Sequence, residues 1–79
     1  MRHYGGHNKK HGVQAYEIGP DSIDIEFGSG WVYRFSYQKP GPTRVEHMKQ
    51  LAESGQGLTT FINKHVRNRF ESRRRKDME

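Results

Sequence analysis

The chain has 79 residues, enough for one domain, and only 30% of them are hydrophobic, so any core must be small. It has no cysteine, which excludes disulfides, thiolate catalysis and cysteine-based zinc sites. No apolar run approaches the roughly 20 residues that a membrane span requires, and none follows the N-terminus as in a signal peptide. We therefore expect a cytoplasmic protein without a membrane partner.

The net charge is +5, and the positive charge is concentrated at the two ends of the chain. Residues 1–10 carry three basic and no acidic side chains, and residues 57–79 carry seven basic and three acidic ones. This asymmetry is typical of a protein with a polyanionic partner, most often nucleic acid. The alternative is that basic ends only aid solubility.

Residues 1–12 are rich in glycine and histidine and show no apolar periodicity, so we interpret them as a flexible basic arm. His7 and His11 have the spacing of metal ligands on one helix face, but the glycines around them disfavour a helix. We expect no metal site and no other cofactor.

Three strands are predicted between residues 13 and 37. Residues 13–18 form a short first strand, and Gly19-Pro20-Asp21 is a strong turn signal after it. Residues 22–27 and 31–37 then alternate between apolar and polar side chains, which is the period of half-buried strands. The positions that share one face are Ile23, Ile25, Phe27, Trp31, Tyr33, Phe35 and Tyr37.

Burial of that face decides how the last two strands pair. A three-residue loop, residues 28–30, places Ile25 opposite Tyr33 and Asp24 opposite Arg34. A two-residue loop would turn the apolar face of one strand outward, which burial forbids. We therefore predict the three-residue loop, with a glycine in the left-handed conformation.

Two helices are predicted after two prolines end the third strand. Thr43 and Glu46 have the spacing of a capping box, so the first helix is expected over residues 43–54, and Gly55 suits the left-handed position after it. Apolar residues recur every four positions in the last third of the chain, which predicts a second helix over residues 59–75. The predicted fold class is α+β, a three-stranded antiparallel meander packed against two C-terminal helices.

Three short motifs carry a family resemblance. They are Phe27-Gly28-Ser29-Gly30 leading into Val32-Tyr33-Arg34-Phe35, then Ala52-Glu53-Ser54, and finally the stretch from Phe61 to Phe70. Together they are similar to the KTSC domain, a small module that occurs alone in bacteria and at the C-terminus of some lysyl-tRNA synthetases. The resemblance covers about residues 13–70. We therefore predict a single domain over residues 13–72, and the run of charged residues after it predicts a charged tail at 73–79. Attachment to a tRNA synthetase also suggests a role in RNA binding.

The sequence disfavours an enzyme. It shows no Ser-His-Asp order, paired carboxylates or phosphate loop. His65, at the edge of the apolar stripe, is more typical of a packed histidine than of a catalytic one. A core of this size is also too small for a deep pocket of the usual ~300 Å³ or more. We therefore expect no catalytic residues and no small-molecule substrate.

Nucleic-acid binding, with RNA as the expected partner, has better support. The second helix and the tail carry basic side chains that can neutralise phosphates, and asparagines that can hydrogen-bond bases or sugars. Tyr33 and Phe35 are expected in the core, whereas Trp31 and Tyr37, near the ends of their strand, can stack on bases. The candidate nucleic-acid-binding residues are Lys64, Arg67, Arg69, Arg73, Arg74, Arg75, Lys76, Asn63, Asn68 and Trp31.

The alternative function is a protein-interaction or homodimerisation module with no nucleic-acid role. The first strand, residues 13–18, would then be an exposed edge that pairs with a strand of a partner or of a second copy. The dependence of affinity on salt separates the two functions, because phosphate-driven binding weakens steeply as salt is added.

Overall fold

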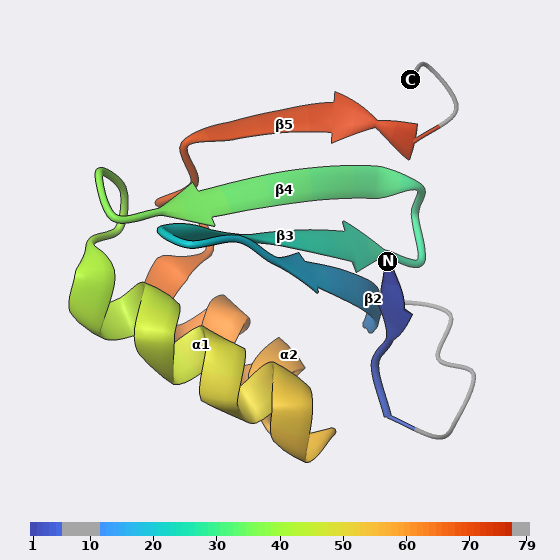
Figure 1. Cartoon of the computed structure of the whole chain (residues 1–79). Coiled ribbons are helices and arrows are strands. Elements are labelled where there is room, and N and C mark those ends of the chain that lie inside the picture. The colour runs from blue at the N-terminus through green and yellow to red at the C-terminus, as the bar shows by residue number, and fades with distance from the viewer. Residues whose placement is uncertain (6–11, 77–79) are drawn as a thin grey trace.

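The computed structural model describes residues 1–5 and 12–76, which form a five-stranded antiparallel sheet with helices on one side of it (Figure 1). The strands lie in the order β1-β2-β3-β4-β5, so each is beside its neighbour in sequence. No helix in the described ranges is both long and apolar enough to cross a membrane. In chain order the elements are β1 (Arg2–His3), β2 (Val13–Ile18), β3 (Ser22–Phe27), β4 (Trp31–Ser36), α1 (Pro42–Ser54), α2 (Leu58–Phe61), the π-helix η1 (Ile62–Val66) and β5 (Ser72–Arg75).

The central meander confirms the prediction. The strands β2 and β3 have the predicted bounds, and β4 ends one residue early. The predicted register of β3 and β4 is present, with Ile25 opposite Tyr33 and Asp24 opposite Arg34. In the loop between them, Gly30 has a φ of 93°, a left-handed conformation that glycine adopts without a steric penalty.

The predicted second helix, residues 59–75, is wrong beyond Val66. The helical segments α2 and η1 end there, and Ser72–Arg75 form β5, which pairs antiparallel with β4. The charged tail predicted at residues 73–79 is therefore part of the sheet as far as Arg75. The sheet, predicted with three strands, has five.

Backbone hydrogen bonding explains why this basic segment is a strand. The N–H of Glu71 donates to the carbonyl oxygen of Arg34 at 2.7 Å, and the N–H of Lys76 donates to that of Gly30 at 2.9 Å. These bonds satisfy polar groups along the outer edge of β4, which a helix over the same residues would leave unpaired. Apolar periodicity does not reveal such a strand, because all four of its side chains are polar.

The N-terminal segment also belongs to the fold. The strand β1 pairs with β2, and Tyr4, directly after β1, is 5% exposed. The Tyr4 hydroxyl accepts a hydrogen bond of 2.9 Å from the backbone N–H of Leu58, the first residue of α2. The flexible arm predicted for residues 1–12 is therefore wrong for its first residues, while residues 6–11 lie outside the described part of the chain.

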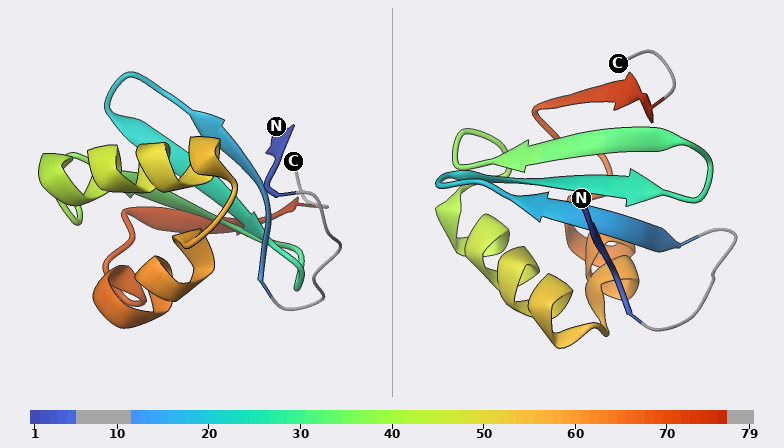
Figure 2. Two further views of the ribbon diagram at one scale, coloured as in Figure 1. Left: turned by 90° about the horizontal axis from the view of Figure 1, so that it is seen from below. Right: turned by 45° about the vertical axis from the view of Figure 1, so that its right-hand side comes forward.

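The helices cover one face of the sheet, and the core lies between the two layers (Figures 1 and 2). Phe27, Tyr33 and Phe70 pack against this core but are only partly buried, so one part of the apolar face is incompletely covered. The buried core residues come from the sheet, the helices and the N-terminal segment: Tyr4, Val13, Tyr16, Ile23, Ile25, Phe35, Val45, Met48, Ala52, Leu58, Ile62 and Val66.

The helix α1 begins at Pro42, one residue before the predicted start, and its N-cap is Gly41. No side chain caps this end, so the capping box predicted for Thr43 and Glu46 does not form. Proline suits the first helical position, because the N–H that it lacks would have no partner within the helix. At the other end Gly55 has the predicted left-handed conformation, with a φ of 82°.

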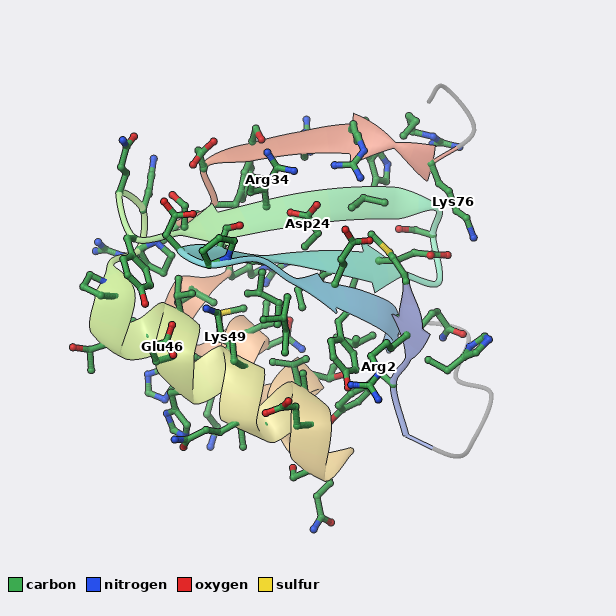
Figure 3. The ribbon with its side chains drawn as sticks, viewed as in Figure 1. Arg2, Asp24, Arg34, Glu46, Lys49 and Lys76 are labelled. Atoms are coloured by element: carbon green, nitrogen blue, oxygen red, sulfur yellow. The ribbon has the colours of Figure 1, made fainter. Side chains whose placement is uncertain are left out.

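Glu46 instead has two partners that favour its charged form. Its carboxylate lies 2.8 Å from Nζ of Lys49 and accepts a hydrogen bond of 2.6 Å from the Tyr37 hydroxyl; Figure 3 labels Glu46 and Lys49 on α1. Lys49 first and Tyr37 second lower the pKa of Glu46 below its ordinary value, and the same hydrogen bond raises the pKa of Tyr37. The stabilisation from Glu46 is therefore present above its ordinary pKa and is lost as the pH falls through the folded-state pKa. The stabilisation from the Tyr37 hydroxyl is present below its ordinary pKa and is lost as the pH rises through its raised folded-state pKa.

We expect Lys49→Met to raise the pKa of Glu46 toward its ordinary value, and by more than Tyr37→Phe does, because Lys49 is the larger cause. A carbon-13 NMR titration of the Glu46 carboxyl group in each variant measures this. Arg44→Met is the control, since it removes a charge of α1 that forms no ion pair with Glu46 among the described residues. Equal pKa changes in Lys49→Met and Arg44→Met would contradict a direct contact.

Candidate nucleic-acid interface

A partly open pocket lies between the β3–β4 hairpin and η1, where the apolar face is incompletely covered. Its volume is about 230 Å³, below the ~300 Å³ at which ordinary small-molecule pockets begin. Aromatic and aliphatic side chains form its walls, and three polar side chains reach it as well. The lining residues are Phe27, Tyr33, Phe35, Ile62, Ser29, Asn63 and Arg67.

The ring of Tyr33 is the centre of the aromatic wall. It meets Phe27 and Phe70 edge to face, with ring centroids 5.3 and 4.8 Å away and interplanar angles of 87° and 85°. The ring of Phe35 lies 6.4 Å away and nearly parallel, at 19°. Edge-to-face and offset parallel arrangements are the favourable ones for aromatic rings. Tyr33 is therefore held in a fixed position although it is only partly buried.

The polar side of the pocket comes from η1 and the residue after it. Ile62 and Val66 are buried on the core side of this segment, and the residue that follows each of them, Asn63 and Arg67, lines the pocket. The π-helical turn is rare in proteins and recurs at functional sites. Here it brings an amide and a guanidinium group to one hollow.

Strand alternation divides the basic run of β5 between the two faces of the sheet. Arg73 is opposite Tyr33 and Arg75 is opposite Trp31, so both lie on the face that carries the pocket. Their guanidinium carbons are 4.7 and 5.2 Å from the centroid of the Trp31 ring, within the range of cation–π contacts. Arg74, between them, lies on the other face.

The other face carries an ion-pair network centred on Asp24, labelled in Figure 3 with Arg34 and Lys76. Arg34 donates to both carboxylate oxygens, from Nε at 2.8 Å and from Nη2 at 3.1 Å, and Nη1 of Arg74 lies 3.7 Å from the same group. Hydrogen bonding to Asp24, and then its charge, raises the pKa of Arg34 above the ordinary value. Lys76 pairs with Glu26 at 3.1 Å. Arg74 and Lys76 therefore already form ion pairs with acidic side chains of β3, which disfavours a phosphate-binding role for them.

The structure divides the ten candidate residues into three groups. Those at or beside the pocket are Asn63, Arg67, Arg73, Arg75 and Trp31. Those on the opposite face are Arg74 and Lys76. Those that are exposed but do not line the pocket are Lys64, Asn68 and Arg69. The predicted basic helix face is not continuous, because the helical segments end before most of these residues.

Sequence reasoning missed Phe27, Ser29 and Tyr33 as parts of a surface site. Alternation places the two rings on the face that the helices cover, and we expected Tyr33 to be part of the core there. The signal that points to the pocket is the alternate placement of aromatic side chains on this face, where Tyr33 and Phe35 join Phe27. Ser29 carries no signal, since it is an ordinary turn residue.

No group of three or more histidine, aspartate or glutamate side chains within residues 1–5 and 12–76 is placed to hold a metal ion. His7 and His11 lie outside these residues. Comparison of the chain with protein-family models, with curated proteins and with solved structures found no match. The similarity to the KTSC domain stays a prediction.

Proposed function

We propose that this chain is a non-catalytic domain that binds RNA, or another single-stranded nucleic acid, at the pocket and the adjoining Trp31–β5 surface. The observation that carries the proposal is the gathering of cations, an amide and partly exposed rings on one face. Proteins that bind single strands combine the same two elements, positive groups that follow the phosphates and aromatic rings on which bases stack.

The charges on this face favour the proposal. Arg67 and Arg73 are exposed, and neither forms an ion pair with an acidic residue of the described chain. An anion that binds them therefore displaces no acidic side chain of the described residues. The opposite face, where acids and bases neutralise each other around Asp24, is poorly suited to a phosphate backbone.

We expect the double variant Arg67→Gln/Arg73→Gln to bind short single-stranded RNA more weakly and with less dependence on salt. If each arginine contacts one phosphate, the slope of log affinity against log salt falls by about 1.4, since a single-strand contact contributes about 0.7. Fluorescence anisotropy of labelled RNA over a series of salt concentrations measures the slope. Trp31, the only tryptophan of the chain, gives an independent signal from within the interface.

The matched control is Lys39→Gln/Arg44→Gln, which removes two exposed positive charges that do not line the pocket. This variant is expected to keep the slope of the unchanged protein. An equal loss in the two double variants would mean that binding follows net charge alone and that this interface is wrong. If no RNA binds even at low salt, the proposal as a whole falls.

The protein-interaction alternative has less support. Its predicted edge, the strand at residues 13–18, is not free along its length, because β1 pairs with Tyr16 and Ala15. The opposite edge of the sheet is β5, whose three consecutive arginines disfavour pairing with a second copy. Sizing chromatography tests the alternative directly, and a stable dimer without RNA would favour it.

A further inference from the structure

We propose that the pocket between the β3–β4 hairpin and η1 holds one unpaired nucleobase of the bound strand, while Arg67 and Arg73 contact phosphates next to that base. The inference rests on the proposed function and adds which part of the ligand enters the protein. In this arrangement the pocket recognises the base, and Arg67 and Arg73 position the strand through its phosphates.

The size and walls of the pocket fit a single planar ring system. Its volume is about 230 Å³, and its apolar walls include the rings of Phe27, Tyr33 and Phe35. A nucleobase has two apolar faces that stack on aromatic side chains and a polar edge that requires hydrogen-bond partners. The pocket thus offers stacking surface to the faces of a base and leaves its edge to the polar lining.

Asn63 supplies the group that the edge of a base requires. Its side-chain amide carries an acceptor and two donors close together, and such an amide can form two hydrogen bonds to one base edge. Asn63 is exposed and lines the pocket from η1, opposite the aromatic wall on the hairpin. Asn68, the next asparagine along the chain, does not line the pocket.

The charge around the pocket selects a nucleotide over a neutral ring such as a peptide side chain. Arg67, the residue after η1, lines the pocket itself. Arg73, on β5 opposite Tyr33, holds its guanidinium over the Trp31 ring on the same face, so two different elements place positive charge at or beside the pocket. In a nucleic-acid strand every base is flanked by phosphates on both sides along the backbone. A planar ring accompanied by two negative charges is therefore the ligand that complements this site.

The aromatic wall is in place before binding. Tyr33 is held by edge-to-face contacts with Phe27 and Phe70, so stacking a base on this wall requires little ordering of side chains. Preorganisation of this kind improves affinity, because less side-chain freedom is lost on association. Base entry should therefore contribute measurably to binding, beyond the attraction between phosphates and arginines.

The first test uses the unchanged protein and two RNA pentanucleotides. One consists of ordinary uridines, and in the other every uridine is replaced by an abasic ribose, which lacks the base. The two strands carry the same phosphates. We expect the abasic strand to bind at least about fivefold more weakly, since stacking one base contributes about this factor in affinity or more. We also expect the salt slope to be the same for both strands, because the phosphate contacts are unchanged.

The second test compares Asn63→Ala with Asn68→Ala, two exposed amides of the same segment of which only the first lines the pocket. We expect Asn63→Ala to weaken binding of the uridine strand severalfold and to leave binding of the abasic strand unchanged. Asn68→Ala should change neither. Chemical-shift mapping with the uridine strand should move the signals of Tyr33 and Phe27, and mapping with the abasic strand should not.

Two outcomes overturn the inference and are distinguishable from each other. If both strands bind equally, with the salt slope of a phosphate-driven complex, the proposed function stands and the pocket does not hold a base. If neither strand binds at low salt, the proposed function and the inference fall together, and a peptide side chain becomes the better occupant.

Discussion

Replacing Tyr4 with alanine is expected to destabilise the protein by about 3–5 kcal/mol, the usual cost of truncating a buried aromatic side chain. Tyr4 is 5% exposed and belongs to the core, although it lies in the segment that the sequence predicts as a flexible arm. Since small domains are stable by only about 5–15 kcal/mol, this loss is a large share of the total. Urea unfolding followed by circular dichroism measures it.

The control is Tyr4→Phe, which keeps the ring and removes the hydroxyl that accepts the hydrogen bond from the N–H of Leu58. That bond joins the N-terminal segment to the start of α2, so its loss should cost about 1 kcal/mol. A loss below about 0.5 kcal/mol for Tyr4→Ala, the level of a surface substitution, would mean that the N-terminal segment is not docked.

Replacing Asp24 with alanine is the second large effect that we expect, a loss of about 1–3 kcal/mol in the free energy of unfolding. The Asp24 side chain is 10% exposed, and its carboxylate holds Arg34 through two hydrogen bonds and Arg74 through a longer contact. Breaking a fully buried ion pair costs more, but the Arg34 side chain is 45% exposed and recovers part of its hydration.

Two further variants separate this interaction from a general effect of charge. Glu17→Ala removes an exposed acid directly opposite Asp24 on β2 and should change stability by less than about 0.5 kcal/mol. A double-mutant cycle of Asp24→Ala with Arg34→Met should give a coupling free energy of at least about 0.5 kcal/mol, as for residues in direct contact. Additive effects would show that the ion pair does not contribute to stability.

The two faces of β4 and β5 have different physical character, and this division bears on function. On one face, Asp24 forms ion pairs with Arg34 and Arg74, and Glu26 forms one with Lys76. On the other face, Arg73 forms no ion pair with an acidic residue among residues 1–5 and 12–76, and the rings of Trp31 and Tyr33 are partly exposed. Substitutions on the first face should therefore act mainly on stability, and substitutions on the second mainly on binding.

The sequence by itself determined the central meander. The alternation of apolar and polar side chains in residues 22–27 and 31–36 indicates which face of the hairpin is buried. Shifting the register of the two strands by one residue would expose Ile25 or Tyr33, so only one register is compatible with the pattern. The loop glycine and the glycine after α1 were equally predictable, because a left-handed backbone requires that residue type. The end of the first helix at Gly55 was predictable for this reason, whereas the capping box from which we predicted its start does not form.

Only the tertiary structure decided which secondary structure the two ends of the chain adopt. It thereby decided which residues form the candidate site. Arg73 and Arg75 form a strand and do not extend a helix because the edge of β4, roughly forty positions earlier, would otherwise be unpaired. No side-chain pattern within β5 indicates that this edge is available. The same pairing places Arg73 opposite Tyr33 and sends Arg74 to Asp24. The local alternation of apolar and polar side chains indicates which residues are buried. The pairing of a strand with a sheet edge depends instead on backbone N–H and C=O groups, which are the same in every sequence.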